Sequence, residues 1–89
     1  MKQYRFKFVT KRGVLLGYFL SIGSKLVSQQ EAKIFTISEQ ALDIESNYIY
    51  NKYMWVFDDI EVFDGLKQII KSQFGGLKKE DILLKIEKV

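Results

Sequence analysis

The sequence contains no cysteine, no histidine and no proline. Without cysteine the chain has neither a disulfide framework nor a thiolate metal site, which fits a reducing compartment, and we expect a cytoplasmic protein. Without histidine it lacks the commonest general base, the commonest zinc ligand and the usual switch near neutral pH. These absences remove most familiar catalytic and metal-dependent sites, so we expect a protein that is not an enzyme, with no cofactor and no bound metal.

The remaining composition is that of one small folded domain. The chain has 89 residues, of which 47% are hydrophobic and 15% aromatic, well outside the range of disordered sequences. We therefore expect a single domain over residues 1–89 with a real core. A domain this short has marginal stability alone, so a partner or homo-oligomerisation would stabilise it. The longest apolar run, residues 14–22, is too short to span a bilayer, and we expect no membrane partner.

The charges are sorted into blocks along the chain. Residues 1–35 carry seven Lys or Arg and one acid, residues 36–65 carry seven acids and one Lys, and residues 66–89 carry six Lys and three acids, which sums to a net charge of +3. Such segregation is typical of a nucleic-acid-binding surface, or of basic and acidic elements that pair within the fold.

The N-terminal third predicts a β-hairpin. In residues 4–10 the even positions begin with Tyr4, Phe6 and Phe8 while odd positions are mostly basic, which is the period of a half-buried strand. A short loop at residues 11–13 and a second apolar strand within residues 14–22 complete the hairpin. Gly17 inside the second strand predicts a bulge or a close approach of two backbones.

The rest of the chain predicts an α+β fold. Apolar residues at helical spacing after Ser38 predict a helix over residues 39–50, while residues 29–37 stay open between helix and turn. Residues 54–63 predict a strand, and Asp64 begins a further helix that ends at the Gly75–Gly76 pair. The tail, residues 80–89, fits both a strand and a helix, and we favour the helix. The expected architecture is a small antiparallel sheet, made of the hairpin and the 54–63 strand, with two or three helices.

The basic face of the first strand is the first candidate interaction surface. Arg5, Lys7, Lys11 and Arg12 would contact phosphates if the protein bound nucleic acid. A stacking platform needs aromatic and cationic side chains on the same face, however, and strand parity puts Tyr4, Phe6 and Phe8 opposite Arg5 and Lys7. We therefore interpret the aromatic residues as core and the cations as the outer face.

The acidic block and the tyrosines are the second candidate surface. Asp58, Asp59 and Glu61 are the ligand type that Mg²⁺ prefers, but their spacing matches no cation-binding loop. We favour a structural role, in which the acidic strand lies beside the basic one and opposite charges face each other. Tyr50 and Tyr53 belong to an aromatic cluster that would supply interface anchors where the rings are exposed.

A resemblance covers about residues 4–50. The segments Gly17-Tyr18-Phe19-Leu20, Glu31-Ala32-Lys33-Ile34-Phe35-Thr36 and Ser38-Glu39-Gln40-Ala41 resemble a pattern of small, mostly uncharacterised domains encoded by phages and prophages of low-GC bacteria. In those domains a strand pair leads through an Ala-Lys-x-Phe-Thr turn into a short helix. The resemblance implies an α+β fold and a phage origin, and it carries no catalytic residues.

We expect a small non-enzymatic protein that binds a host protein and regulates or inhibits it. Segregated charge supports this expectation because it steers protein association and gives it specificity. The alternative is nucleic-acid binding through the basic hairpin and the C-terminal lysines, Lys78, Lys79 and Lys85.

Overall fold

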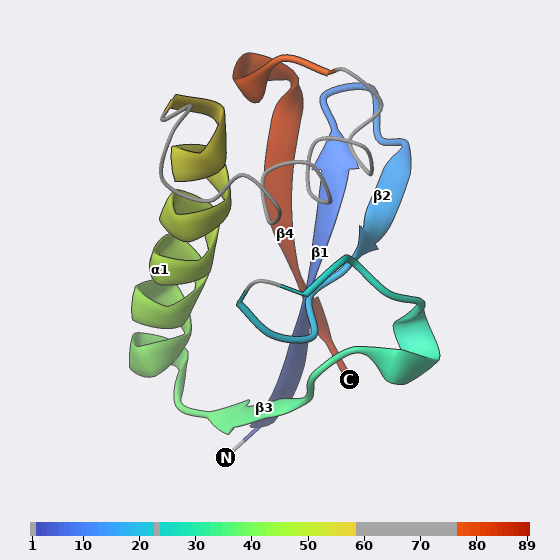
Figure 1. The fold of residues 1–89 in the computed structure, drawn as a ribbon. Helices are drawn as coiled ribbons and strands as arrows, with labels where there is room; N and C mark the ends of the chain where they lie inside the picture. The colour runs from blue at the N-terminus through green and yellow to red at the C-terminus, as the bar shows by residue number, and fades with distance from the viewer. Residues whose placement is uncertain (1, 23, 59–76) are drawn as a thin grey trace.

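A computed structural model describes residues 2–22, 24–58 and 77–89, with the backbone alone for residues 55–58. The described residues form one antiparallel sheet of four strands and one long α-helix, with two short 3₁₀ turns (Figure 1). The helix lies along the β4 side of the sheet, and the N- and C-termini both lie at the lower end of the view. This arrangement confirms an antiparallel sheet in an α+β fold.

The first strand is the centre of the sheet. β1 (Lys2–Thr10) pairs along one edge with β2 (Leu15–Tyr18) at its C-terminal half and with β3 (Phe35–Ile37) at its N-terminal half. Its other edge pairs with β4 (Ile82–Lys88) over seven positions, from Tyr4 opposite Lys88 to Thr10 opposite Ile82. β1 is therefore hydrogen-bonded on both sides, while β4 is an edge strand among the described residues.

The hairpin confirms the prediction for the N-terminal third. Gly13 adopts φ 86°, and the turn is closed by hydrogen bonds from Gly13 N–H to Thr10 C=O (2.8 Å) and from Thr10 N–H to Val14 C=O (2.9 Å). The register shifts between Phe8 and Val9, so the pairing contains a bulge. Gly17, beside this shift, has φ 150°, and a Cβ built there would lie 2.6 Å from Leu26 Cβ. Both expected features of Gly17, the bulge and the close approach, are present.

The long helix supplies one wall of the core. α1 (Glu39–Asp58) begins after Ser38, whose side chain accepts a hydrogen bond from Ala41 N–H at 3.2 Å, so Ser38 is the predicted N-cap. The helix packs on the aromatic face of β1, where the Phe8 and Tyr53 rings lie 5.0 Å apart between centroids. The buried core cluster comprises Tyr4, Phe6, Phe8, Phe19, Leu26, Leu42, Ile49, Tyr53, Met54 and Ile82.

Two predicted elements are wrong where the structure describes them. The strand expected over residues 54–63 is helical as far as Asp58, because Ile49 and Tyr53, four residues apart, continue the buried helical face. The tail is a strand rather than a helix, preceded by a 3₁₀ turn at Lys79–Asp81, because its alternate apolar residues pair along β1. Residues 59–63 and the helix expected after Asp64 lie outside the described residues. With one α-helix in the described ranges, the expected count of two or three is not supported.

The segment left open by the sequence is neither a helix nor a single turn. Residues 29–37 contain a 3₁₀ turn at Gln29–Glu31 and then β3. β3 lies at the base of Figure 1, below the start of α1, and it contributes Phe35, whose ring lies 4.9 Å from that of Phe6.

Candidate interaction surfaces

A polar cluster centred on Glu87 occupies the sheet face opposite the helix. Arg5 donates from Nε to Glu87 Oε1 at 3.0 Å and also from Nη2 to the same oxygen. Tyr18 donates its hydroxyl to Oε2, Gln29 donates to Oε1 at 2.8 Å, and Lys7 Nζ lies 3.6 Å from Oε2. Three residues thus donate hydrogen bonds to one carboxylate and a fourth forms an ion pair with it, and we call this group the Glu87 cluster.

The cluster holds Glu87 ionised. The hydrogen bond from Tyr18, followed by those from Arg5, lowers the pKa of Glu87 to about 2. The same Tyr18 hydrogen bond, together with burial of the ring, raises the pKa of Tyr18 above 10.0. The Arg5 guanidinium also lies over the Tyr18 ring, 5.6 Å from its centroid, so stacking and ion pairing act on the same side chain.

The Glu87 cluster accounts for two cations of the first basic block, Arg5 and Lys7. Arg5 and Lys7 do lie opposite the aromatic face, as strand parity predicts, and one acid, Glu87, forms an ion pair with each of them. That acid comes from β4, and was missed because the tail was expected to be a helix. A strand over residues 82–88, run antiparallel to β1, is the signal that finds it. Asp59 and Glu61 lie outside the described residues, and Asp58 is the last residue of α1.

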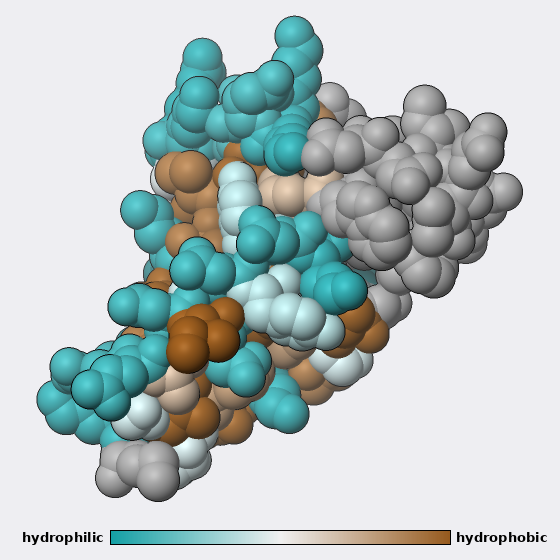
Figure 2. Space-filling model, turned by 90° about the vertical axis from the view of Figure 1, so that its left-hand side faces the viewer, coloured by the Kyte–Doolittle hydropathy of each residue, from teal (hydrophilic) through white to brown (hydrophobic). Residues whose placement is uncertain are grey.

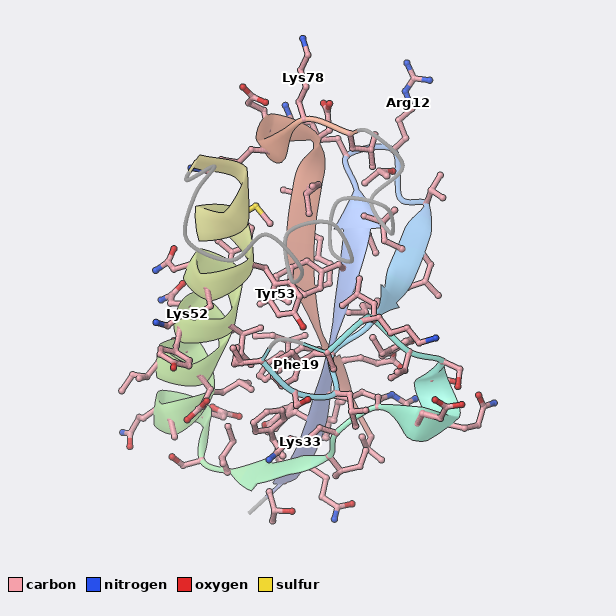
Figure 3. The ribbon with its side chains drawn as sticks, in the orientation of Figure 1. Arg12, Phe19, Lys33, Lys52, Tyr53 and Lys78 are labelled. Atoms are coloured by element: carbon pink, nitrogen blue, oxygen red, sulfur yellow. The ribbon has the colours of Figure 1, made fainter. Side chains whose placement is uncertain are left out.

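The other two predicted cations lie at the far end of the hairpin. Lys11 and Arg12 form the turn, where Lys11 N–H donates to Asp81 C=O at 3.0 Å and joins the hairpin to the 3₁₀ turn before β4. This contact places Lys11 at the end of the molecule where the 3₁₀ turn lies, and Figure 3 shows Arg12 and Lys78 pointing outward from that end. The structure therefore divides the four predicted cations, with Arg5 and Lys7 in the Glu87 cluster and Lys11 and Arg12 at this end.

The two predicted tyrosines differ in exposure. Tyr53 is 2% exposed and donates its hydroxyl to Ser21 C=O (3.1 Å) and Ser24 C=O (3.2 Å), so it belongs to the core and not to a surface. Its burial raises its pKa to about 12. Tyr50 is half-buried and donates to Ile82 C=O at 3.4 Å, which joins α1 to the beginning of β4.

A pocket that sequence reasoning missed lies between the loop after β2, β3 and α1. It has a volume of about 210 Å³. We call it the loop–helix pocket, and its lining residues are Phe19, Leu20, Ser21, Ile22, Lys33, Phe35, Glu45, Tyr48 and Ile49. Figure 3 places Phe19 in the space between sheet and helix and Lys33 near β3. No single segment of the sequence contains this pocket, because its three walls are distant in the chain.

The rim of the loop–helix pocket is apolar and exposed. Leu20, Ile22 and Tyr48 are 39%, 45% and 52% exposed, and Ile44, one helical turn before Tyr48, is 71% exposed. Figure 2 views the molecule from the side of α1 and shows exposed apolar residues among the hydrophilic residues of this face. Exposed large apolar side chains around a hollow are typical of a site for another molecule.

Comparison with known proteins gives no relative. The sequence matches no family model, and no curated protein or solved structure matches it significantly. Among the described residues no group of three or more acidic side chains is placed to hold a metal ion. None of the helices in the described ranges is long and apolar enough to cross a membrane.

Proposed function

We propose that this protein is a non-enzymatic binding domain that regulates or inhibits another protein, with the loop–helix pocket as its contact surface. The observation that carries the proposal is the ring of exposed apolar side chains, Leu20, Ile22 and Tyr48, around a hollow with a buried floor. Interfaces draw most of their affinity from a few apolar anchors packed in such central pockets. Because the sequence resembles prophage domains, we propose that the partner is a protein of the bacterial host.

The size of the pocket favours a side chain over a small-molecule cofactor. At about 210 Å³ it lies below the range of roughly 300–1,000 Å³ that holds drug-sized ligands. Its lining includes Phe19 and Ile49, both nearly inaccessible to solvent, so an inserted apolar side chain would contact mainly apolar groups. One large aliphatic or aromatic anchor of a partner protein suits these dimensions.

Two charges flank the apolar rim and would orient the partner. Lys33 lies over the Phe35 ring, with Nζ 5.3 Å from the ring centroid, and Glu45 comes from α1 on another wall of the pocket. A partner carrying an acid and a base on either side of its anchor would meet both. Such pairs contribute more to orientation and association rate than to affinity.

The test compares capture by two matched variants. Ile22→Lys puts a charge on the pocket rim, while Val14→Lys introduces the same charge at another exposed apolar residue, on the hairpin and away from the pocket. We expect wild type and Val14→Lys to capture one stoichiometric partner from a low-GC bacterial lysate, identified by mass spectrometry, and Ile22→Lys to lose it. No stoichiometric partner for wild type, or equal capture by Ile22→Lys, would contradict the proposal.

Nucleic-acid binding is a second candidate function, favoured by one observation. Lys11 and Arg12 lie at the same end of the molecule as Lys78, and all three are exposed. With Arg5 and Lys7 engaged by Glu87, this end would supply the phosphate contacts, and the few cations there predict a shallow salt dependence. The protein should then retard the electrophoretic mobility of DNA and RNA at about 50 mM salt, and the Arg12→Ala variant should bind them more weakly. Absence of any shift under that condition removes this candidate.

A further inference from the structure

The outer edge of β4 has backbone groups that point away from the sheet. Val89 N–H donates to Gln3 C=O at 2.9 Å and Lys11 N–H donates to Asp81 C=O at 3.0 Å, so the odd-numbered residues of this segment bond toward β1. Because residues alternate in an antiparallel ladder, the N–H and C=O groups of Ile82, Leu84, Ile86 and Lys88 point outward.

The beginning of this edge is already occupied. Tyr50 donates its hydroxyl to Ile82 C=O at 3.4 Å, while α1 as a whole runs beside β4 along most of its length (Figure 1). Within the described ranges, the ladders place only β1 beside β4, so the outward groups of Leu84, Ile86 and Lys88 have no strand to bond. Among the described residues, no strand pairs with this edge over residues 83–89, whose midpoint is Ile86.

We infer that a second copy of this chain pairs antiparallel with this edge, about a two-fold axis through Ile86. In such a pair, the outward N–H and C=O groups of even-numbered residues in one chain must face those of even-numbered residues in the other. The two-fold axis therefore passes through a residue and not between two residues. An axis at Lys85 sets Lys85 against its own copy, and one at Glu87 sets two carboxylates together, both unfavourable. An axis at Leu84 needs the C=O of Ile82, which Tyr50 occupies.

The Ile86 register satisfies charge and apolar contacts together. It places Lys85 of each chain opposite Glu87 of the other on one face, so two complementary pairs form. On the same face Leu83 meets Val89 of the second copy, and on the other Ile86 meets its own copy; Val89 and Ile86 are 53% and 41% exposed in the single chain. About six inter-chain hydrogen bonds would form.

The helix leaves room beside this edge. A hollow of about 260 Å³ between α1 and β4 is lined by Ser46, Asn47 and Tyr50 from the helix and Leu83, Leu84 and Ile86 from the strand. Side chains of a second β4 would enter it. The two sheets would join into one continuous sheet. The exposed edge of β4, which could otherwise pair with other chains and cause aggregation, would be covered. This inference is independent of the loop–helix pocket.

The first test uses a variant that spares the monomer. In the single chain Lys85 faces Lys7 across the ladder, so Lys85→Glu replaces a like-charge pair by an opposite-charge pair. In the dimer the same change sets two carboxylates together on each side of the axis. Sedimentation equilibrium should show a wild-type dimer whose dissociation constant rises about tenfold or more in Lys85→Glu. Lys25→Glu, the same charge change in an exposed loop, should leave it unchanged.

The second test determines the register in which the two β4 strands pair. The chain has no cysteine, so Ile86→Cys introduces one thiol. Hydrogen-bonded antiparallel partners have Cα atoms about 5.5 Å apart, within the range a disulfide spans, and oxidation should cross-link the chains. Lys88→Cys, out of register with its own copy, should not cross-link. A wild-type monomer at high concentration, a dimer insensitive to Lys85→Glu, or cross-linking at residue 88 but not at residue 86 would overturn the inference.

Discussion

Replacing Glu87 by glutamine tests whether one carboxylate holds the outer face of the sheet together. Arg5 and Gln29 donate to Oε1 and Tyr18 donates to Oε2, so both oxygens act as acceptors. An amide keeps the shape but offers a single acceptor and no charge. Arg5, whose side chain is 19% exposed, would then lose its counter-ion in a site with limited access to water.

The expected magnitude follows from the kind of bond that is lost. Hydrogen bonds to charged groups contribute about 1.5–3 kcal/mol each, and partial exposure with salt screening reduces the sum, so we expect Glu87→Gln to lower the free energy of unfolding by about 2 kcal/mol at pH 7. In a domain of this size that corresponds to a fall in Tm of roughly 10 °C. Urea and thermal denaturation followed by circular dichroism measure both quantities.

The pH dependence separates this cause from a general packing defect. The native pKa of Glu87 is lowered to about 2 from an ordinary 4.5, so its stabilisation is fully present above pH 4.5 and is lost as the pH falls toward 2. The difference between wild type and Glu87→Gln should therefore shrink through this window. Glu31→Gln, at an exposed site, is the control and should cost little at any pH. A difference under about 0.5 kcal/mol at pH 7, or one that stays constant down to pH 2, would refute the reasoning.

Two further predictions concern the core and the bulge. Tyr53→Phe removes a hydroxyl that donates to two backbone carbonyls and should cost about 1–2 kcal/mol in urea denaturation. Since burial raises the pKa of Tyr53 to about 12, wild type should lose stability as the pH rises from 10 toward 12, and this part of the loss should be absent in Tyr53→Phe. Gly17→Ala should cost about 3 kcal/mol, because φ is 150° and the new Cβ would lie 2.6 Å from Leu26 Cβ. Gly13→Ala, with φ 86° and nothing within 4 Å, should cost about 1 kcal/mol, and equal losses at the two glycines would contradict the packing argument.

The hairpin and the start of the helix could be predicted because their signals are local. Alternation in residues 4–10 gives the buried face of β1, Gly17 marks the bulge, and Ser38 caps α1. Each of these depends on residues within a few positions of one another.

The C-terminal strand and the partner of Arg5 could not be predicted with the same ease. The tail satisfies both helical and strand spacing, and the choice is made by a ladder with β1, whose residues are far away in the chain. The aromatic and β-branched residues at 53–57 favour a strand locally, but packing of Ile49, Tyr53 and Met54 against the sheet carries the helix on to Asp58. The loop–helix pocket depends on the same distant contacts.

The pairing of β1 with β4 has a consequence for biosynthesis. The Arg5–Glu87 contact joins residues 82 positions apart, and the ladder around it is the longest in the sheet. On the ribosome Phe6 and Phe8 emerge early, but one edge of their strand has no partner until β4 has been made. Folding is therefore expected to be completed only after nearly the whole domain has emerged, and contacts of such high sequence separation form slowly. Until then β1 has one unpaired edge and an exposed face that carries Phe6 and Phe8, and such edges and apolar surfaces make incompletely folded chains prone to aggregate.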